Sequence, residues 1–183
     1  NGQVACATCH KPELMFTDSL PLAVGVGIGP VHTPSLVGLS YSPWFYWDGR
    51  KDSQWAQALA PLEAKHEHAT DRIQLLQLLS TDSDYRVMYE EIFGELPAVS
   101  NLPETGTPEG DEAQQANWNT LDTGTQRAVS EFFANLGKAI AAYERKIMPG
   151  PTPFDEYIAQ LSTDPAEPKA LSNTEIAGLR IFI

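Results

Sequence analysis

"VACATCH", residues 4–10, contains the only two cysteines of the 183-residue chain, and a histidine follows the second directly. A C-x-x-C pair alone fits a zinc half-site, a redox dithiol or a disulfide. A structural zinc ion needs about four ligands, and His32, His66 and His68 are not spaced as a pair of finger ligands. A thioredoxin-type dithiol needs a βαβ context, which this sequence lacks.

C-x-x-C-H fits a different chemistry, in which two thioether bonds attach a haem covalently and the adjacent imidazole binds the iron on its proximal side. The motif therefore predicts a covalently bound haem c on Cys6 and Cys9, with His10 as the iron ligand. The function then depends on the other axial position. An electron carrier fills it with a protein ligand, whereas an enzyme keeps it open for peroxide or dioxygen.

The composition excludes some partners. With 12 basic and 24 acidic side chains, the formal charge is −12, which argues against nucleic acid because phosphates favour basic surfaces. The acidic balance fits a generic soluble surface or a positively charged redox partner. No apolar run approaches the roughly 20 residues needed to cross a bilayer. The sequence does not open with a signal peptide, which is compatible with an exported protein whose leader has been removed.

The hydrophobic pattern predicts an all-α chain with long loops. The stretch 16–43 has the Gly and Pro content of a loop, and the acidic stretch 95–124 is expected to be a surface insertion. We expect helices over 1–10, 52–59, 70–80, 81–94, 125–147, 153–161 and from 171 onward. The longest helix is expected to bury a stripe formed by Val129, Phe132, Phe133, Leu136, Ile140, Tyr143 and Ile147.

Several motifs together resemble the bacterial di-haem cytochrome c peroxidases and their MauG-like relatives. They are CATCH, then TPSL at 33–36, FYWDGR at 45–50 and QALAP at 57–61, followed by a glutamate, and KAIAAYERKIMPGPTPFDEY at 138–157. The stretch 171–183, LSNTEIAGLRIFI, resembles the helix that leads into that family's second haem motif.

The resemblance implies a cytochrome c-like peroxidatic haem domain over 1–148, with 95–124 as an insertion. Residues 149–183 would then be a linker and the first helices of a second cytochrome c-like domain. No second C-x-x-C-H is present, so we expect the second haem in a further C-terminal part beyond this chain. The family also implies a periplasmic location.

The resemblance also assigns roles to three side chains. Trp47 would pass electrons between the two haems; otherwise it is a core aromatic. Glu67 would be the distal general acid and base for O–O cleavage, with a carboxyl pKa raised by burial beside the haem; otherwise it is a solvated charge. Gln57 would donate a hydrogen bond in the same pocket; otherwise it is an exposed helix residue.

Two departures from the family pattern matter. The classical peroxidases have an iron-blocking histidine in the glycine-rich loop, and the matching residue here is Val24. Valine at this position favours an iron with one open axial position, as in the MauG-like branch. His32 replaces an asparagine that is an inter-domain calcium ligand in the relatives, which weakens the expectation of calcium. His32 is then a pocket residue, a displaced ligand or an ordinary loop histidine.

The first hypothesis is therefore an exported di-haem oxidoreductase that uses hydrogen peroxide. Its electrons would come from a small cytochrome c or cupredoxin, or from a side chain of a partner protein substrate. The second is an electron carrier without catalysis, which needs a further iron ligand from among Met15, Met88, Met148 and His32. A haem-binding sensor or structural module is a third.

Overall fold

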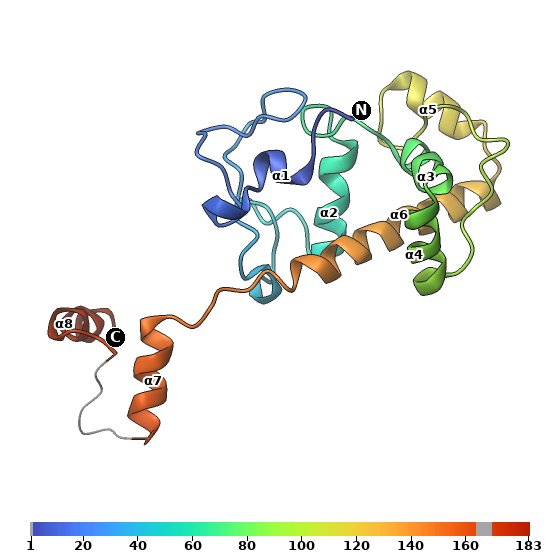
Figure 1. The fold of residues 1–183 in the computed structure, drawn as a ribbon. Coiled ribbons are helices and arrows are strands. Elements are labelled where there is room, and N and C mark those ends of the chain that lie inside the picture. The colour runs from blue at the N-terminus through green and yellow to red at the C-terminus, as the bar shows by residue number, and fades with distance from the viewer. Residues whose placement is uncertain (1, 164–169) are drawn as a thin grey trace. The chain divides into compact units, whose positions relative to one another are not determined.

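The computed structural model describes residues 2–163 and 170–183, and every regular element in this part of the chain is a helix (Figure 1). Extended pairing within these residues is limited to three isolated bridges, which join Lys11 to Thr17, Val24 to Ile28 and Phe45 to Lys51. The expectation of an all-α chain is confirmed. The alternating glycines of the first loop do not form a strand.

The helices divide between two compact units, the first ending at Ile147 and the second beginning at Met148. The first contains α1 (Cys6–Cys9), the 3₁₀ turns η1 (Pro12–Leu14) and η2 (Leu39–Tyr41), α2 (Gln54–Glu63), α3 (Arg72–Thr81), α4 (Ser83–Phe93), α5 (Glu112–Asn119) and α6 (Thr123–Glu144). The second contains α7 (Pro153–Thr163) and α8 (Asn173–Phe182).

Helix α6 organises the first unit, because both α2 and α3 pack against it and α4 packs against α3. The hydrophobic core lies among these helices and α5; its buried members are Leu62, Ile73, Leu76, Tyr89, Trp118, Val129, Phe132 and Phe133. In the view of Figure 1, α1 and its long loops lie on one side of α2, and α3 to α5 lie on the other. The core is thus separate from the cysteine motif.

The buried face of α6 differs from the expected stripe near its C-terminus. Tyr143 is 64% exposed, whereas Ala141 and Glu144 are buried. The buried face continues through Gly137, Ala141 and Glu144, at spacings of four and three residues. A search for large apolar side chains misses this continuation because its members are small or polar.

Gly137 shows why a small residue is needed on the buried face of α6. A Cβ atom at this position would lie 2.6 Å from the backbone oxygen of Trp55 and 2.8 Å from Cγ of Leu59, both on α2. The missing side chain therefore allows α2 and α6 to cross at close range, which determines where α2 places its remaining side chains.

Two expected helix limits are corrected. Helix α1 covers only Cys6–Cys9 instead of residues 1–10, and its first turn is capped by Thr8, whose Oγ1 accepts from the Ala5 N–H at 3.1 Å. Helix α2 runs through Pro61 to Glu63. A proline in a helix interior costs about 3 kcal/mol, but Pro61 lies in the last turn, next to Leu62, which is buried in the core.

The segment 95–124 is not only a surface insertion. It contains α5 and places the Trp118 indole, 6% exposed, in the same core cluster as Phe132 and Phe133. The buried carboxylate of Asp71 caps α3 and accepts a hydrogen bond from Thr105 of the same segment. The acidic composition of 95–124 concealed these few inward-facing groups.

Candidate functional site

The two cysteines lie at the ends of α1, a single helical turn, in which positions three apart share one side. Both are free thiols, and the backbone N–H of His10 donates to the carbonyl of Cys6 at 2.9 Å. The turn therefore places both cysteines on one side with the histidine directly following, the order that covalent haem attachment requires.

The imidazole of His10 is oriented by the loop that follows it. Its Nδ1 atom lies 2.9 Å from the carbonyl oxygen of Phe16. Because a carbonyl can only accept, Nδ1 carries the hydrogen, and the lone pair is left on Nε2, which is the arrangement found in histidines that ligate metals.

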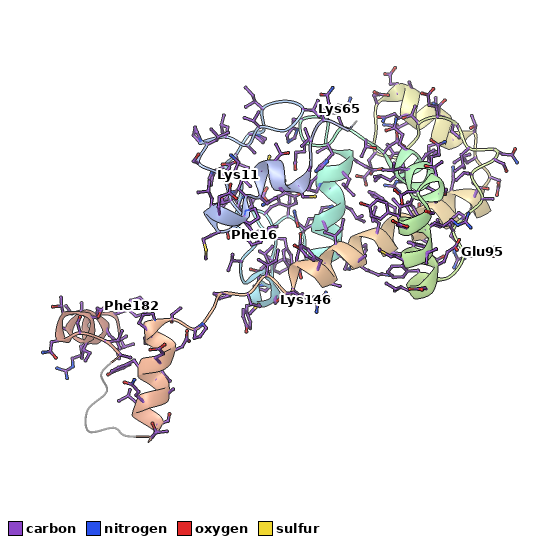
Figure 2. All side chains as sticks on the ribbon, in the orientation of Figure 1. Lys11, Phe16, Lys65, Glu95, Lys146 and Phe182 are labelled. Atoms are coloured by element: carbon purple, nitrogen blue, oxygen red, sulfur yellow. The ribbon has the colours of Figure 1, made fainter. Side chains whose placement is uncertain are left out.

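A tight turn holds that carbonyl in place. Lys11 and Phe16, both labelled in Figure 2, close the turn through a Phe16 N–H bond to the Lys11 carbonyl at 2.8 Å, and Lys11 N–H donates to Thr17 at 3.0 Å. Met15 and Phe16 have φ values of 57° and 56°. Two successive left-handed residues are uncommon outside glycine. The hydrogen bonds that close the turn therefore hold this backbone conformation.

The glycine-rich loop, residues 23–29, is hydrogen-bonded both to Cys9 and to Glu67. The thiol of Cys9 donates to the carbonyl of Val24 at 3.4 Å. Two residues later, the Val26 N–H donates to the Glu67 carbonyl, and the Gly27 N–H donates to that of His66, both at 3.0 Å. One loop therefore contacts both the haem motif and the segment that carries the expected proton-transfer residue.

Gly25 allows this approach. A Cβ atom there would lie 2.7 Å from the His66 carbonyl oxygen and 2.8 Å from Cα of Glu67, distances that real Cβ atoms essentially never show. At Gly27 the nearest atom is 3.4 Å away, an ordinary contact. Of the alternating glycines, Gly25 is therefore required by the close approach to the turn at residues 66–67, whereas Gly27 is not.

Glu67 is half-buried and has several charged or polar neighbours. Its Oε1 atom lies 3.5 Å from Nε2 of His66. Burial, followed by the negative charges of Asp18 and Glu67, raises the pKa of the Cys9 thiol. Burial lowers the pKa of His68, with Glu67 opposing this and His10 adding to it. Glu67 therefore lies within electrostatic range of the haem motif.

Gln57, on α2, has a side-chain oxygen that is buried and has no hydrogen-bond partner within the described residues. An unpartnered buried amide oxygen costs free energy unless a ligand or water satisfies it. The neighbouring group is Tyr46: burial and then the charge of Glu67 raise the pKa of its phenol, while Gln57 and Arg50 act in the opposite direction. The Tyr46 phenol therefore lies within interaction range of both Gln57 and Glu67, and these three side chains are called the cluster below.

Trp47 does not join that cluster. Its side chain is 64% exposed, and its indole N–H donates to the carbonyl of His32 at 2.9 Å. The interpretation of Trp47 as a core aromatic is therefore wrong. Its role in electron transfer is taken up below as a proposal.

His32 is held on both ring nitrogens. Nδ1 lies 2.6 Å from the Leu20 carbonyl and 3.4 Å from Oδ1 of Asp18, and Nε2 lies 3.1 Å from Oγ1 of Thr17. Thr33 donates to the buried Asp18 carboxylate at 2.6 Å. Binding of His32 to iron would break one of these contacts.

The segment 2–53 has the surface expected of a cofactor cradle. Phe45 is its one buried large apolar side chain. Its exposed apolar side chains are Leu14, Met15, Leu20, Leu22, Val24, Val26, Ile28, Val31, Tyr41, Trp44 and Trp47. Together these side chains supply the apolar contact area that a haem would need, with little of it used inside the protein. With the free His10 Nε2 and the unpartnered Gln57 oxygen, the residues present fit a haem.

Within residues 2–163 and 170–183, no three His, Cys, Asp or Glu side chains cluster in a way that could hold a metal ion. In that same part of the chain, no helix has both the length and the apolar character required to span a membrane.

Tyr46, Asp18 and Thr33 belong to this region and were not singled out from the sequence. Tyr46 lies in a run with four other aromatic residues between positions 41 and 47, so its type alone carried no signal. The buried Asp18 could have been suspected only from its pairing with His32, which requires the folded loop.

Comparison with known proteins gives consistent matches. Residues 1–163 match the family model described as di-haem cytochrome c peroxidase. Over 96 residues, 51% of the chain, the sequence is 38% identical to methylamine utilization protein MauG of Methylorubrum extorquens, of which the match covers 27%. Over 183 residues, 98% of the chain, it is 26% identical to cytochrome c551 peroxidase of Pseudomonas aeruginosa, of which it covers 42%.

A crystal structure of a MauG-like protein associated with microbial copper homeostasis has a similar fold, with a TM-score of 0.62 and 19% identity. The similarity covers 100% of this chain and 44% of that one. This chain therefore spans less than half of the length of the relatives that it matches.

Proposed function

This chain belongs to the di-haem cytochrome c peroxidase family, and from that premise we propose that it is the peroxidatic part of an exported c-type oxidoreductase that activates hydrogen peroxide. The observation that carries the proposal is the glycine-rich loop, which hydrogen-bonds Cys9 through Val24 and Glu67 through Val26. It joins the cofactor motif to the backbone of the residue that carries the expected proton-transfer carboxylate.

Cys6 and Cys9 would hold the haem through thioethers, and His10 Nε2 would bind its iron. When bound, the haem supplies the redox-active iron at which the O–O bond of peroxide is cleaved. The Phe16 carbonyl fixes the His10 ring and increases its basicity through the Nδ1 hydrogen bond.

Glu67 would act as the acid and base of this cleavage. Its carboxylate takes a proton from one oxygen of peroxide and returns it to the other, which leaves as water instead of hydroxide. The Gln57 amide would donate to the peroxide oxygens, and its buried, unpartnered oxygen would be satisfied by water or ligand in the pocket.

Trp47 would carry electrons between this haem and a second one in a further part of the protein. Its exposed indole is held by one hydrogen bond to the His32 carbonyl, so its orientation is fixed while its face remains free. The reductant would be a small cytochrome c or cupredoxin, or a side chain of a partner protein. A periplasmic location follows from covalent haem attachment in this family.

Val24 favours the MauG-like variant of this chemistry, because its side chain has no atom that could bind iron and so block the open position. His32 cannot replace it without losing its contacts to Leu20 or Thr17. Calcium is disfavoured at His32 for the same reason, since both of its ring nitrogens already have partners.

The test is an optical and EPR spectrum of the oxidised, haem-loaded protein before and after one equivalent of peroxide. A high-spin ferric signal that peroxide changes supports the proposal, and Glu67→Gln should slow that change by about 100-fold or more, the usual contribution of an acid–base group. Glu131→Gln, at an exposed position of α6, is the matched control.

A low-spin spectrum that peroxide does not change, both as purified and after one-electron reduction, would overturn the proposal in favour of an electron carrier. A response seen only after reduction would retain peroxide activation but reject the open-site, MauG-like variant.

A further inference from the structure

We propose that Tyr46 is a third hydrogen-bonding residue of the peroxide pocket, which donates its phenolic hydrogen to a small ligand held between Glu67 and Gln57. The inference rests on the proposed function and adds a residue to its site. Tyr46 occupies the unspecified position of F-x-W-D-G-R, the pattern through which the chain resembles its family.

The backbone directs Tyr46 differently from its neighbours. Phe45 pairs with Lys51, through N–H and carbonyl contacts of 2.9 and 3.5 Å, and is buried. Trp47 is exposed. Tyr46, between them, is half-buried with φ at 66°. A bulky residue in the left-handed region is strained, and such strain is concentrated at functional sites.

The ring of Tyr46 is fixed on one face. The guanidinium carbon of Arg50 lies 3.5 Å from the ring centroid, and Arg50 is itself held by Asp48, whose Oδ1 accepts from Nη1 at 2.8 Å. A cation held over the face of an aromatic ring attracts it. The Gly49 N–H also donates to the Tyr46 carbonyl at 3.2 Å. Ring and backbone are thus both constrained. The phenolic oxygen is in hydrogen-bonding range of the Gln57 and Arg50 side chains, which donate, so the hydroxyl hydrogen is the part left for a ligand.

The surroundings of the hydroxyl keep it a donor. Burial, followed by the negative charge of Glu67, raises the pKa of the phenol against the smaller opposing effects of Gln57 and Arg50. A neutral phenol has one O–H to donate. Gln57 contributes a buried amide oxygen without a partner to the same cluster. A ligand or water that accepts from Tyr46 and donates to Gln57 would satisfy both.

The experiment measures fluoride binding to the oxidised, haem-loaded protein. Fluoride binds ferric iron and accepts hydrogen bonds, so its affinity reports the donors around the open position without requiring turnover. Tyr46→Phe retains the ring under Arg50 and removes only the hydroxyl. We expect fluoride affinity to fall about 3- to 10-fold, the effect of one net hydrogen bond. Affinity for imidazole, which does not need this donor, should change less than twofold.

Tyr41→Phe is the matched control, because Tyr41 is 79% exposed. Tyr46→Met, a second variant without the hydroxyl, should show the same loss and keeps the test valid if Tyr46→Phe does not fold. Unchanged fluoride affinity in a folded Tyr46 variant overturns the inference while peroxide reactivity of the unchanged protein still supports the proposed function. Failure of the unchanged protein to bind fluoride and to react with peroxide overturns both.

Discussion

Nδ1 of His10 lies 2.9 Å from the carbonyl oxygen of Phe16, and that carbonyl is positioned by two consecutive left-handed residues. The His10 imidazole is therefore oriented by the backbone and not by another side chain. Such an arrangement is sensitive to conformation, because any change that flattens the turn removes the acceptor from the imidazole.

The first prediction concerns Met15, whose side chain is 60% exposed and whose φ is 57°. Met15→Val should destabilise the protein by about 1–2 kcal/mol, because a β-branched residue is disfavoured in the left-handed region. Met15→Asn should be nearly neutral, since asparagine tolerates that region. Urea unfolding measures both variants. Equal stabilities would contradict the view that the backbone conformation holds the turn.

The second prediction concerns Gly25, where a Cβ atom would collide with the backbone of His66 and Glu67. Gly25→Ala should separate the glycine-rich loop from the turn that carries Glu67, with a loss of about 1–3 kcal/mol of stability, as overpacking produces. Peroxide reactivity should fall with it. Gly27→Ala, with its nearest atom at 3.4 Å, is the control. If both variants react with peroxide equally fast, the loop does not position Glu67.

The helices around the core could be predicted because their periodicity is produced by burial on one face. The same physical signal failed where burial used small or polar groups, at Gly137 and Glu144 on α6, or where a few buried side chains lay in an acidic segment, as with Trp118. Whether those residues are buried depends on the side chains of the segments packed against them, and the local sequence carries no information on these.

For the site, the motif predicts the attachment residues because their chemistry requires adjacency in sequence. Glu67 and Gln57 were found only through resemblance to the family, since each could equally be a solvated side chain. Tyr46 could not be distinguished from its aromatic neighbours, because only the folded turn shows that Phe45 is buried, Trp47 exposed and Tyr46 half-buried at a positive φ.

The third prediction concerns pH and the buried carboxyl of Asp18. Burial raises its pKa, but the Thr33 hydroxyl, the Leu20 N–H and the charge of His32 outweigh this, so the pKa is lowered. A lowered pKa in the folded state adds stability above the unfolded value, about pH 4, and this stability is lost as the pH falls through the folded value.

Thr33→Val should therefore cost about 1–3 kcal/mol near pH 7, because the buried carboxylate loses a donor at 2.6 Å. The difference from the unchanged protein should shrink as the pH falls below about 4 and through the lowered folded-state pKa of Asp18, because the carboxyl then becomes protonated in both proteins. Unfolding midpoints of both proteins, measured at intervals of about one pH unit from pH 3 to 7, test this. Thr125→Val, which removes the same 2.6 Å bond to the exposed Asp122, should have a smaller effect. A difference independent of pH would show that the hydroxyl acts through packing alone.

The fourth prediction joins the core to the site through Gly137. A Cβ atom there would lie 2.6 Å from the Trp55 carbonyl, so Gly137→Ala must push α2 away from α6. The better helix propensity of alanine, about 1 kcal/mol, offsets only part of an overpacking cost of about 1–3 kcal/mol, and urea unfolding should show a net loss. Gly178→Ala on α8, where nothing lies within 4 Å, should gain stability from helix propensity without a clash.

The same substitution at Gly137 should also affect the site. Because Gln57 is on the same helix as Trp55, two residues further on, the shift of α2 should weaken fluoride binding at the haem. If Gly137→Ala instead stabilises the protein and leaves fluoride affinity unchanged, the close crossing of α2 and α6 does not determine the position of Gln57.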